Sequence, residues 1–216
     1  MWKQSVVVVA GALAFLPTLA NATPVATRFC VQAAGPGIQD KAPTGTYSVV
    51  PVDTTRTVYK GDFGKNGPIT EQRQQSVGST LDSGLDVHFA EWGITRVERI
   101  EDATGLVLVG EVLVADAGSV AARIASPVNG PGKAEIHTVW RVVDAKAPDI
   151  PLFQVYVVGE DLDSVEQYAL PPLLSQEIPK SIRNALKKPT KAKTRTNFVD
   201  IVKELRAEQD AVHGPG

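Results

Sequence analysis

Hydrophobic residues recur at spacings of three and four between residues 70 and 93, which predicts one long amphipathic helix. The residues on its buried face are Val77, Leu81, Leu85, His88, Phe89 and Trp92. Thr70 can cap the start of this helix, and Gly93 stands where the residue after a helix often takes a left-handed backbone. Gly84 falls on the buried side, where the missing side chain lets the helix approach a sheet closely.

Strand patterns lie on both sides of this helix. A short β-branched run, residues 47–52, precedes it. Four further segments follow it: 94–100, 106–115, 133–144 and 152–158. Segment 106–115 is almost continuously apolar, which is typical of a central strand covered on both faces. Segment 133–144 instead alternates between two faces. This order predicts an α+β fold with a mixed, largely antiparallel sheet of about five strands, packed on one long helix and followed by C-terminal helices.

The composition divides the chain into four regions. Residues 1–22 resemble a signal peptide, 23–45 an extended N-terminal segment, 46–161 the α+β domain and 162–216 a helical, basic C-terminal region. Two amphipathic helices are expected in the last region, one from Ile178, Ile182 and Leu186, the other from Phe198, Ile201, Val202, Leu205 and Val212.

The N-terminus has the pattern of a cleaved secretion signal. Lys3 precedes an uncharged apolar run, Val6 to Leu16, which Pro17 ends, and Ala20-Asn21-Ala22 fits the small-x-small sequence before a cleavage site. The run is shorter than the roughly 20 apolar residues that a membrane span needs. We therefore predict cleavage after Ala22 and a periplasmic or secreted protein, with an uncleaved anchor as the alternative.

Charge and cysteine content exclude further classes of protein. The 216 residues include 22 Lys plus Arg, 24 Asp plus Glu and one Cys, which excludes a disulfide scaffold and a basic chain of the nucleic-acid-binding type. Residues 180–216 carry nine Lys plus Arg and four Asp plus Glu. The basic run 187–195 within them is interpreted as a solvated linker, as a contact with an acidic protein or the core's own acidic surface, or as a contact with anionic lipid or nucleic acid. Export argues against nucleic acid.

The sequence offers little catalytic chemistry. The glycine-rich stretch 130–134 lacks the Ser or Thr of a phosphate-binding loop, and no Gly-x-Ser-x-Gly nucleophile turn occurs. His88, His137 and His213 stand far apart, and Cys30 is alone, so no metal or other cofactor is predicted. His88 is interpreted as a hydrogen-bonded boundary histidine rather than a titrating switch.

One constellation of polar residues lies on the alternating strand. The two-residue period places Glu135, His137 and Arg141 on the same face. They form either a ligand or partner surface, or a solvated sheet face with charge pairs between strands.

Four stretches also carry a family resemblance: Leu108-Val109-Gly110-Glu111-Val112, Gly118-Ser119-Val120-Ala121-Ala122-Arg123, Asn129 to Ile136, and Val142-Val143-Asp144-Ala145. The chain resembles, over about Tyr47 to Asp161, uncharacterised bacterial envelope proteins of the domain-of-unknown-function type, which are often lipoproteins. This resemblance implies an envelope domain that serves assembly or transport structures and has no known catalytic site. The chain departs from the pattern because it lacks a lipid-carrying N-terminal Cys.

The sequence therefore favours an exported, non-catalytic protein-binding or assembly module. Its expected partner is an envelope protein, and the basic tail is expected to make a weak contact with an anionic surface. Recognition is expected through loop 118–132, an exposed strand edge or the C-terminal helices. The candidate binding residues are Arg123, Glu135, His137, Arg141, Phe198 and Leu205. The oligomeric state stays open.

Two rival functions are kept. An envelope or extracellular enzyme of the hydrolase type would need Glu135, His137, Asp116 or Asp144 to converge in a cleft. A small-molecule or lipid-binding domain would need an apolar cavity under the long helix.

Overall fold

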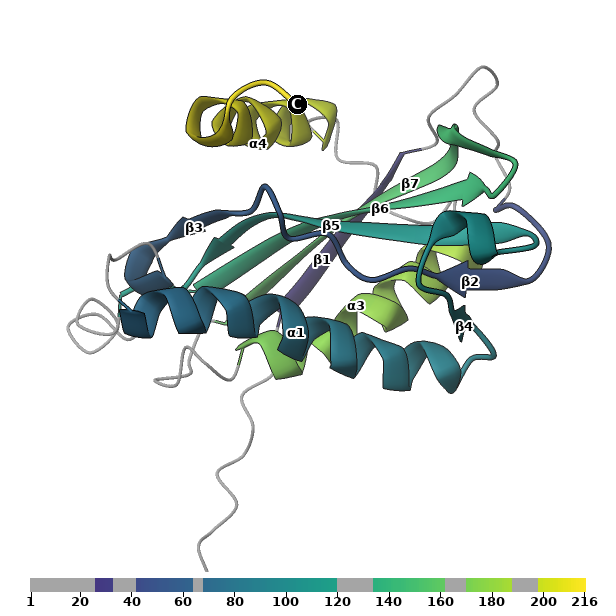
Figure 1. The fold of residues 1–216 in the computed structure, drawn as a ribbon, viewed down its shortest axis with the longest axis horizontal. Helices are drawn as coiled ribbons and strands as arrows, with labels where there is room; N and C mark the ends of the chain where they lie inside the picture. Colours follow the sequence, from purple (N-terminus) through teal and green to yellow (C-terminus); the bar gives the residue numbers. More distant parts are fainter. Residues whose placement is uncertain (1–25, 33–41, 64–67, 120–133, 162–169, 188–197) are drawn as a thin grey trace, which may run out of the picture.

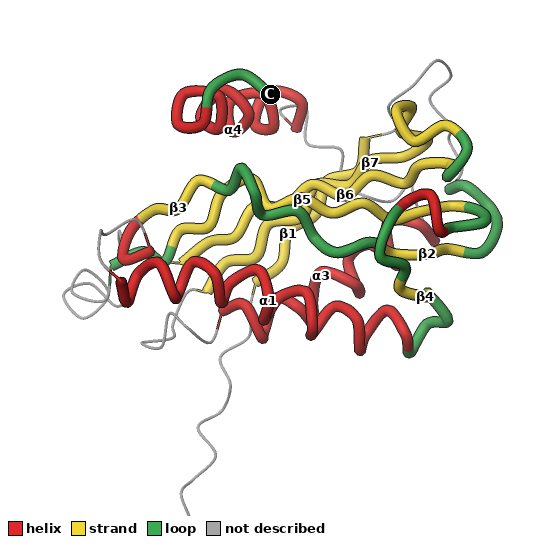
Figure 2. Tube along the Cα trace, in the orientation of Figure 1, coloured by secondary structure: helices red, strands yellow, loops and turns green. Residues whose placement is uncertain are grey.

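The computed structural model describes residues 26–32, 42–63, 68–119, 134–161, 170–187 and 198–216, and shows one open sheet with helices on both faces (Figures 1 and 2). The strands are β1 (Ala26–Gln32), β2 (Tyr47–Val49), β3 (Val58–Lys60), β4 (Thr95–Arg96), β5 (Leu106–Asp116), β6 (Ala134–Asp144) and β7 (Ala147–Asp161). The helices are α1 (Pro68–Ala90), α3 (Leu170–Lys187) and α4 (Phe198–His213), with 3₁₀ turns η1 (Gly61–Phe63) and η2 (Ile100–Asp102).

The strand order is β1-β7-β6-β5-β2-β4, and β3 pairs with the far end of β5. In the row β5, β6, β7 and β1 each strand is antiparallel to its neighbour, whereas β2 and β3 run parallel to β5 and β4 runs parallel to β2. The predicted α+β fold with a mixed, largely antiparallel sheet is therefore confirmed. The sheet has seven strands rather than about five, because β1 and β3 join it.

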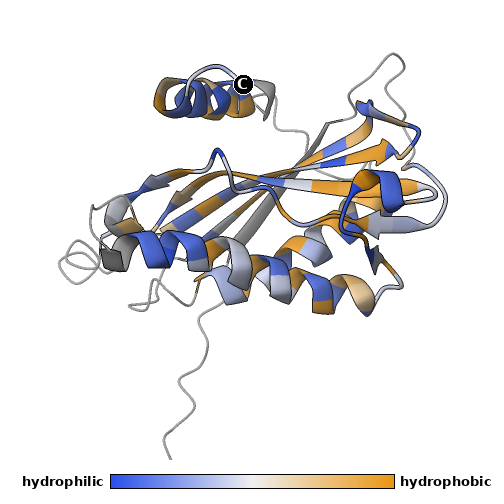
Figure 3. Cartoon of the chain, viewed as in Figure 1, coloured by the Kyte–Doolittle hydropathy of each residue, from blue (hydrophilic) through white to orange (hydrophobic). Residues whose placement is uncertain are grey.

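The alternation along β6 decides which face each layer covers. Ala134, Ile136 and Trp140 lie in the larger core cluster with α1 and α3, while Val139 lies in a second cluster with the apolar residues of α4. Figure 3 shows hydrophobic and hydrophilic residues interspersed along the long strands and a mostly hydrophilic first half of α1. Helices therefore cover both faces, and the sheet is the middle layer.

Helix α1 follows the predicted period. Val77, Leu81, Leu85 and Phe89 are all buried, and Gly93 has a φ of 74°, as expected for the residue that ends a helix. His88 is half-buried and its Nδ1 lies 3.3 Å from Oε2 of Glu91, so it is a boundary residue that contacts the turn after its helix.

Helix α3 packs beside α1 on the same face of the sheet. It begins at Leu170, eight residues before the apolar pattern that predicted it, because Pro171 and Pro172 occupy the first turn, where no backbone N–H is needed. Leu170, Leu174, Ile178 and Ile182 of α3 are buried in the larger core cluster. Strand β1 lies within the predicted N-terminal segment 23–45, and α3 within the predicted C-terminal region, so the layers extend beyond residues 46–161 on both sides.

Gly84 is needed for helix packing, and here the prediction of a close approach to the sheet is wrong. A Cβ at this position would lie 2.5 Å from Cβ of Ser175, which belongs to α3. Gly110 of β5 has the corresponding role beneath Trp140, where a Cβ would lie 2.5 Å from Cη2 of the indole. Both glycines let a neighbouring side chain or helix pack directly on the backbone.

Candidate functional site

The structure brings two of the predicted site residues together on the α4 side of β6. Nε2 of His137 lies 3.0 Å from Oε2 of Glu135, and Nδ1 lies 2.6 Å from Oη of Tyr156. A carboxylate can only accept, so Nε2 carries the proton and Nδ1 accepts from the Tyr156 hydroxyl in the neutral imidazole. The imidazole thus uses both of its nitrogens within the protein.

The enzyme hypothesis also named Asp116 and Asp144. Tyr156 is only 4% exposed, so its phenol is not presented to a substrate. Asp116 of β5 lies opposite Glu135 in the register of the sheet. Asp144 lies at the other end of β6, where its Oδ1 accepts a hydrogen bond from the backbone N–H of Lys146 at 2.9 Å. The four residues do not converge on one point.

The remaining predicted binding residues are placed as follows. Arg141 lies on the same strand, between Val109 and Gln154 in the sheet register. Leu205 is half-buried and packs with the α4 side of the sheet. Arg123 and the side chain of Phe198 lie outside the residues that the structure describes.

Helix α4 is fixed to the sheet by charged groups as well as by apolar contacts. The guanidinium of Arg206 binds both carboxylate oxygens of Glu111, at 2.5 and 2.6 Å, and the fully buried Gln209 donates to the backbone carbonyl of Arg56 at 3.0 Å. Two further ion pairs join the same surfaces, Lys60 with Glu208 at 2.7 Å and Arg56 with Asp210 at 2.7 Å. The C-terminal region therefore uses both signs of charge to contact the core's own surface.

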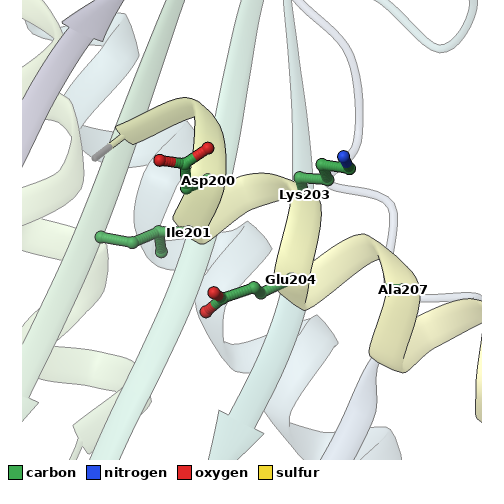
Figure 4. Close-up of a pocket in the computed structure, with 5 residues that line it drawn as sticks. All are labelled: Asp200, Ile201, Lys203, Glu204 and Ala207. Carbon is green, nitrogen blue, oxygen red and sulfur yellow. The ribbon is translucent and has the colours of Figure 1, made fainter. Parts of the chain in front are cut away.

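A hollow of about 510 Å³ runs along α4 and is lined by Asp200, Ile201, Lys203, Glu204 and Ala207 (Figure 4). Its polar side chains carry charges of both signs, two carboxylates against one ammonium. Mixed charge on one exposed helix surface is typical of a solvated face.

A second hollow is an apolar groove of about 350 Å³ at the C-terminal ends of α1 and α3. We call it the α1/α3 groove. It is lined by Tyr47, Phe89, Trp92, Ile94, Ile182, Arg183, Leu186 and Lys187. These residues come from β2, from the end of α1 and the turn after it, and from α3, so only the folded chain assembles them.

Aromatic rings shape this groove. Phe89 is buried and meets the ring of Trp92 edge to face at 6.2 Å between centroids. The Arg183 guanidinium lies 4.9 Å from the centroid of the Trp92 ring, within cation-π range. Tyr47 donates its hydroxyl to the backbone carbonyl of Pro43 at 2.5 Å, and burial raises the pKa of this phenol. The groove therefore has apolar walls with a cation fixed at its rim.

An ion-pair network holds β4 against α1 beside the groove. The Arg96 guanidinium binds Asp82 at 2.8 Å and also binds Asp86, while Oδ1 of Asp82 accepts from the backbone N–H of Val52 at 2.9 Å. Burial raises the pKa of Asp86, although the hydrogen bond and charge of Arg96 oppose this shift. Since Ile94 precedes β4 directly, the network fixes one wall of the groove.

Among the described residues, no group of three or more His, Cys, Asp or Glu could hold a metal ion. In the same part of the chain, no helix has both the length and the apolar character that a membrane crossing requires.

Comparisons with known proteins give structural likenesses only. No family model matches the chain, and no curated protein matches it. The structure is similar to a PelC dodecamer from Paraburkholderia phytofirmans, with 11% identity, a TM-score of 0.34, and coverage of 73% of this chain and 97% of that chain. A point variant of that dodecamer gives 13% identity and a TM-score of 0.37, covering 73% of this chain and 98% of that chain.

A third similar structure is protein XCC0632 from Xanthomonas campestris, which is described by the domain-of-unknown-function family DUF330. It shares 11% identity and a TM-score of 0.37, over 74% of this chain and 94% of that chain. The structural neighbours thus include a protein from an uncharacterised domain family.

Proposed function

We propose that this chain is an exported, non-catalytic module that binds a protein partner in the bacterial envelope, and that the α1/α3 groove is its contact surface. The observation that carries this proposal is the composition of the groove. Trp, Tyr and Arg are the residues most enriched among those that dominate the free energy of protein association, and Trp92, Tyr47 and Arg183 line one opening here. Export and the envelope location rest on the signal pattern of residues 1–22.

The shape of the groove also suits a protein segment. Phe89 and Ile182 form a fully buried floor, while Arg183 and Lys187 are exposed at the rim. An apolar floor with a polar rim is the usual anatomy of a protein interface. A volume of about 350 Å³ is at the small end of ligand pockets, and it accommodates one or two large side chains from a partner.

The test is co-purification of a C-terminally tagged chain from the envelope fraction after mild crosslinking. Trp92→Ala is compared with Val87→Ser, which replaces another apolar residue of the same region that is 59% exposed and outside the groove. Loss of a Trp at the centre of an interface costs about 2 kcal/mol, or roughly 30-fold in affinity. We expect a protein partner that is lost with Trp92→Ala and retained with Val87→Ser.

Thermal unfolding of both variants serves as the control for folding. Because Trp92 is partly buried beside Phe89, a second variant, Arg183→Gln, changes the groove at an exposed position without opening a cavity. Recovery of the same partner in equal amounts from wild type, Trp92→Ala and Arg183→Gln would contradict the proposal.

A further inference from the structure

We propose that the α1/α3 groove takes an acidic linear segment of its partner, with a bulky apolar side chain seated above the floor of Phe89 and Ile182 and carboxylates placed against Arg183 and Lys187. This inference rests on the proposed function and names the chemistry of the partner. It follows from the charges at the rim of the groove and from the sequence that continues beyond it.

The two cations of the rim belong to one exposed face of α3. Arg183 and Lys187 are four residues apart, so they lie one turn above each other on the helix. Neither forms an ion pair with any residue that the structure describes, although several other cations of the chain do. Arg183 is held over Trp92 instead, with its guanidinium at the opening.

The acidic residues on the neighbouring parts of α1 and α3 have other partners. Glu91 precedes Trp92 but pairs with His88, and Glu177 pairs with Lys180 at 2.5 Å on α3. Asp86 binds Arg96. Arg183 and Lys187 therefore place two exposed cations, without an ion pair among the described residues, next to apolar walls, which is complementary to a segment that carries both carboxylates and an apolar side chain.

The amino-acid sequence extends this positive charge. Lys187 is followed in the chain by Lys188, Lys191, Lys193 and Arg195, and residues 188–197 contain no Asp or Glu. A run of like charges attracts an oppositely charged partner over about 8 Å at physiological salt. A partner with several acidic residues thus fits better than a neutral apolar one.

The test uses the purified full chain and three short synthetic peptides with the same fluorescent label, measured by fluorescence anisotropy. The first is Glu-Glu-Leu-Phe-Glu-Glu, the second replaces every Glu with Lys, and the third replaces Leu-Phe with Ser-Ser. We expect saturable binding of the first peptide only. The double variant Arg183→Gln with Lys187→Gln should raise its Kd about tenfold, or about threefold for each exposed pair.

Lys146→Gln is the matched control, because Lys146 is an exposed cation outside the groove, and it should leave the Kd unchanged. Equal binding of the acidic and basic peptides, or no binding of any peptide, would overturn the inference about the partner's chemistry. In either case the co-purification experiment still decides the proposed function separately. Sodium dodecanoate serves as a further probe, followed by the fluorescence of Trp92. If it binds and no peptide does, the groove holds a small amphiphile, and both the inference about the partner and the proposed function are overturned.

Discussion

The contact between α1 and α3 predicts an unusual response to a mutation that normally stabilises a helix. Replacing a glycine with alanine inside a helix gains about 1 kcal/mol of helix propensity. At Gly84 the new Cβ would lie 2.5 Å from Cβ of Ser175, so the helices would have to move apart. Overpacking of a close contact costs about 1–3 kcal/mol. Because 2.5 Å is far inside van der Waals contact, the cost should lie in the upper part of this range, about 2–3 kcal/mol. After the gain in propensity, we expect Gly84→Ala to lower the free energy of unfolding by about 1–2 kcal/mol.

This prediction can be checked by urea and thermal unfolding against a control on the same helix. Gly78 faces the Thr54 side chain, with a Cβ placed 3.1 Å from its hydroxyl oxygen, and this side chain can shift. Gly78→Ala should thus change stability by less than about 1 kcal/mol. For Gly84→Ala the Tm should fall by about 2–8 °C.

A double-mutant cycle identifies the cause. Ser175→Gly removes the atoms that the new Cβ would meet, so adding it to Gly84→Ala should show a coupling of about 1–2 kcal/mol in favour of the double variant. A Gly84→Ala protein that is as stable as wild type would refute the close packing of α1 on α3.

Two further predictions concern electrostatics. Glu111→Gln removes the charge that binds Arg206 under α4 and should lower the free energy of unfolding by about 1.5–3 kcal/mol. Glu208→Gln, at the more exposed pair with Lys60, should lower it by less than about 1 kcal/mol. Chemical denaturation measures both values, and equal effects would contradict the central place of Glu111. Because burial raises the pKa of Asp86, the folded state holds this proton more tightly, and stability should fall as the pH rises from about 3.9 through the raised pKa. In Asp86→Asn the unfolding midpoint should no longer decrease over this pH range. A variant with the same pH profile as wild type would contradict the raised pKa of Asp86.

The elements with a clear hydrophobic period were predictable from the sequence. Helix α1 repeats its apolar residues from Val77 to Phe89, and β5 and β6 have the continuous and alternating patterns of strands packed between helices. Strand β3 has three residues, too few for a pattern, and β1 lies in a region whose Ala, Pro and Thr content favoured an irregular chain. Proline at the start of α3 concealed its first two turns.

The α1/α3 groove was not predictable in the same way. Phe89, Trp92 and Ile182 had the spacing of core residues, and the sequence gives no indication that a groove opens above them. Tyr47 joins them only because β2 pairs with β5. The one available signal was the step from an apolar residue, Ile182, to a cation, Arg183, on a helix that leads into a basic run.

The most direct test of the central claim is photo-crosslinking inside the native cell. A benzoylphenylalanine in place of Leu186 lies in the groove, and the same residue in place of Ile150, which is 51% exposed, lies outside it. If the groove binds a protein partner, ultraviolet light should give a discrete crosslinked protein from position 186 and none from position 150. A crosslinked protein from position 150 alone, or from neither position, would contradict the account.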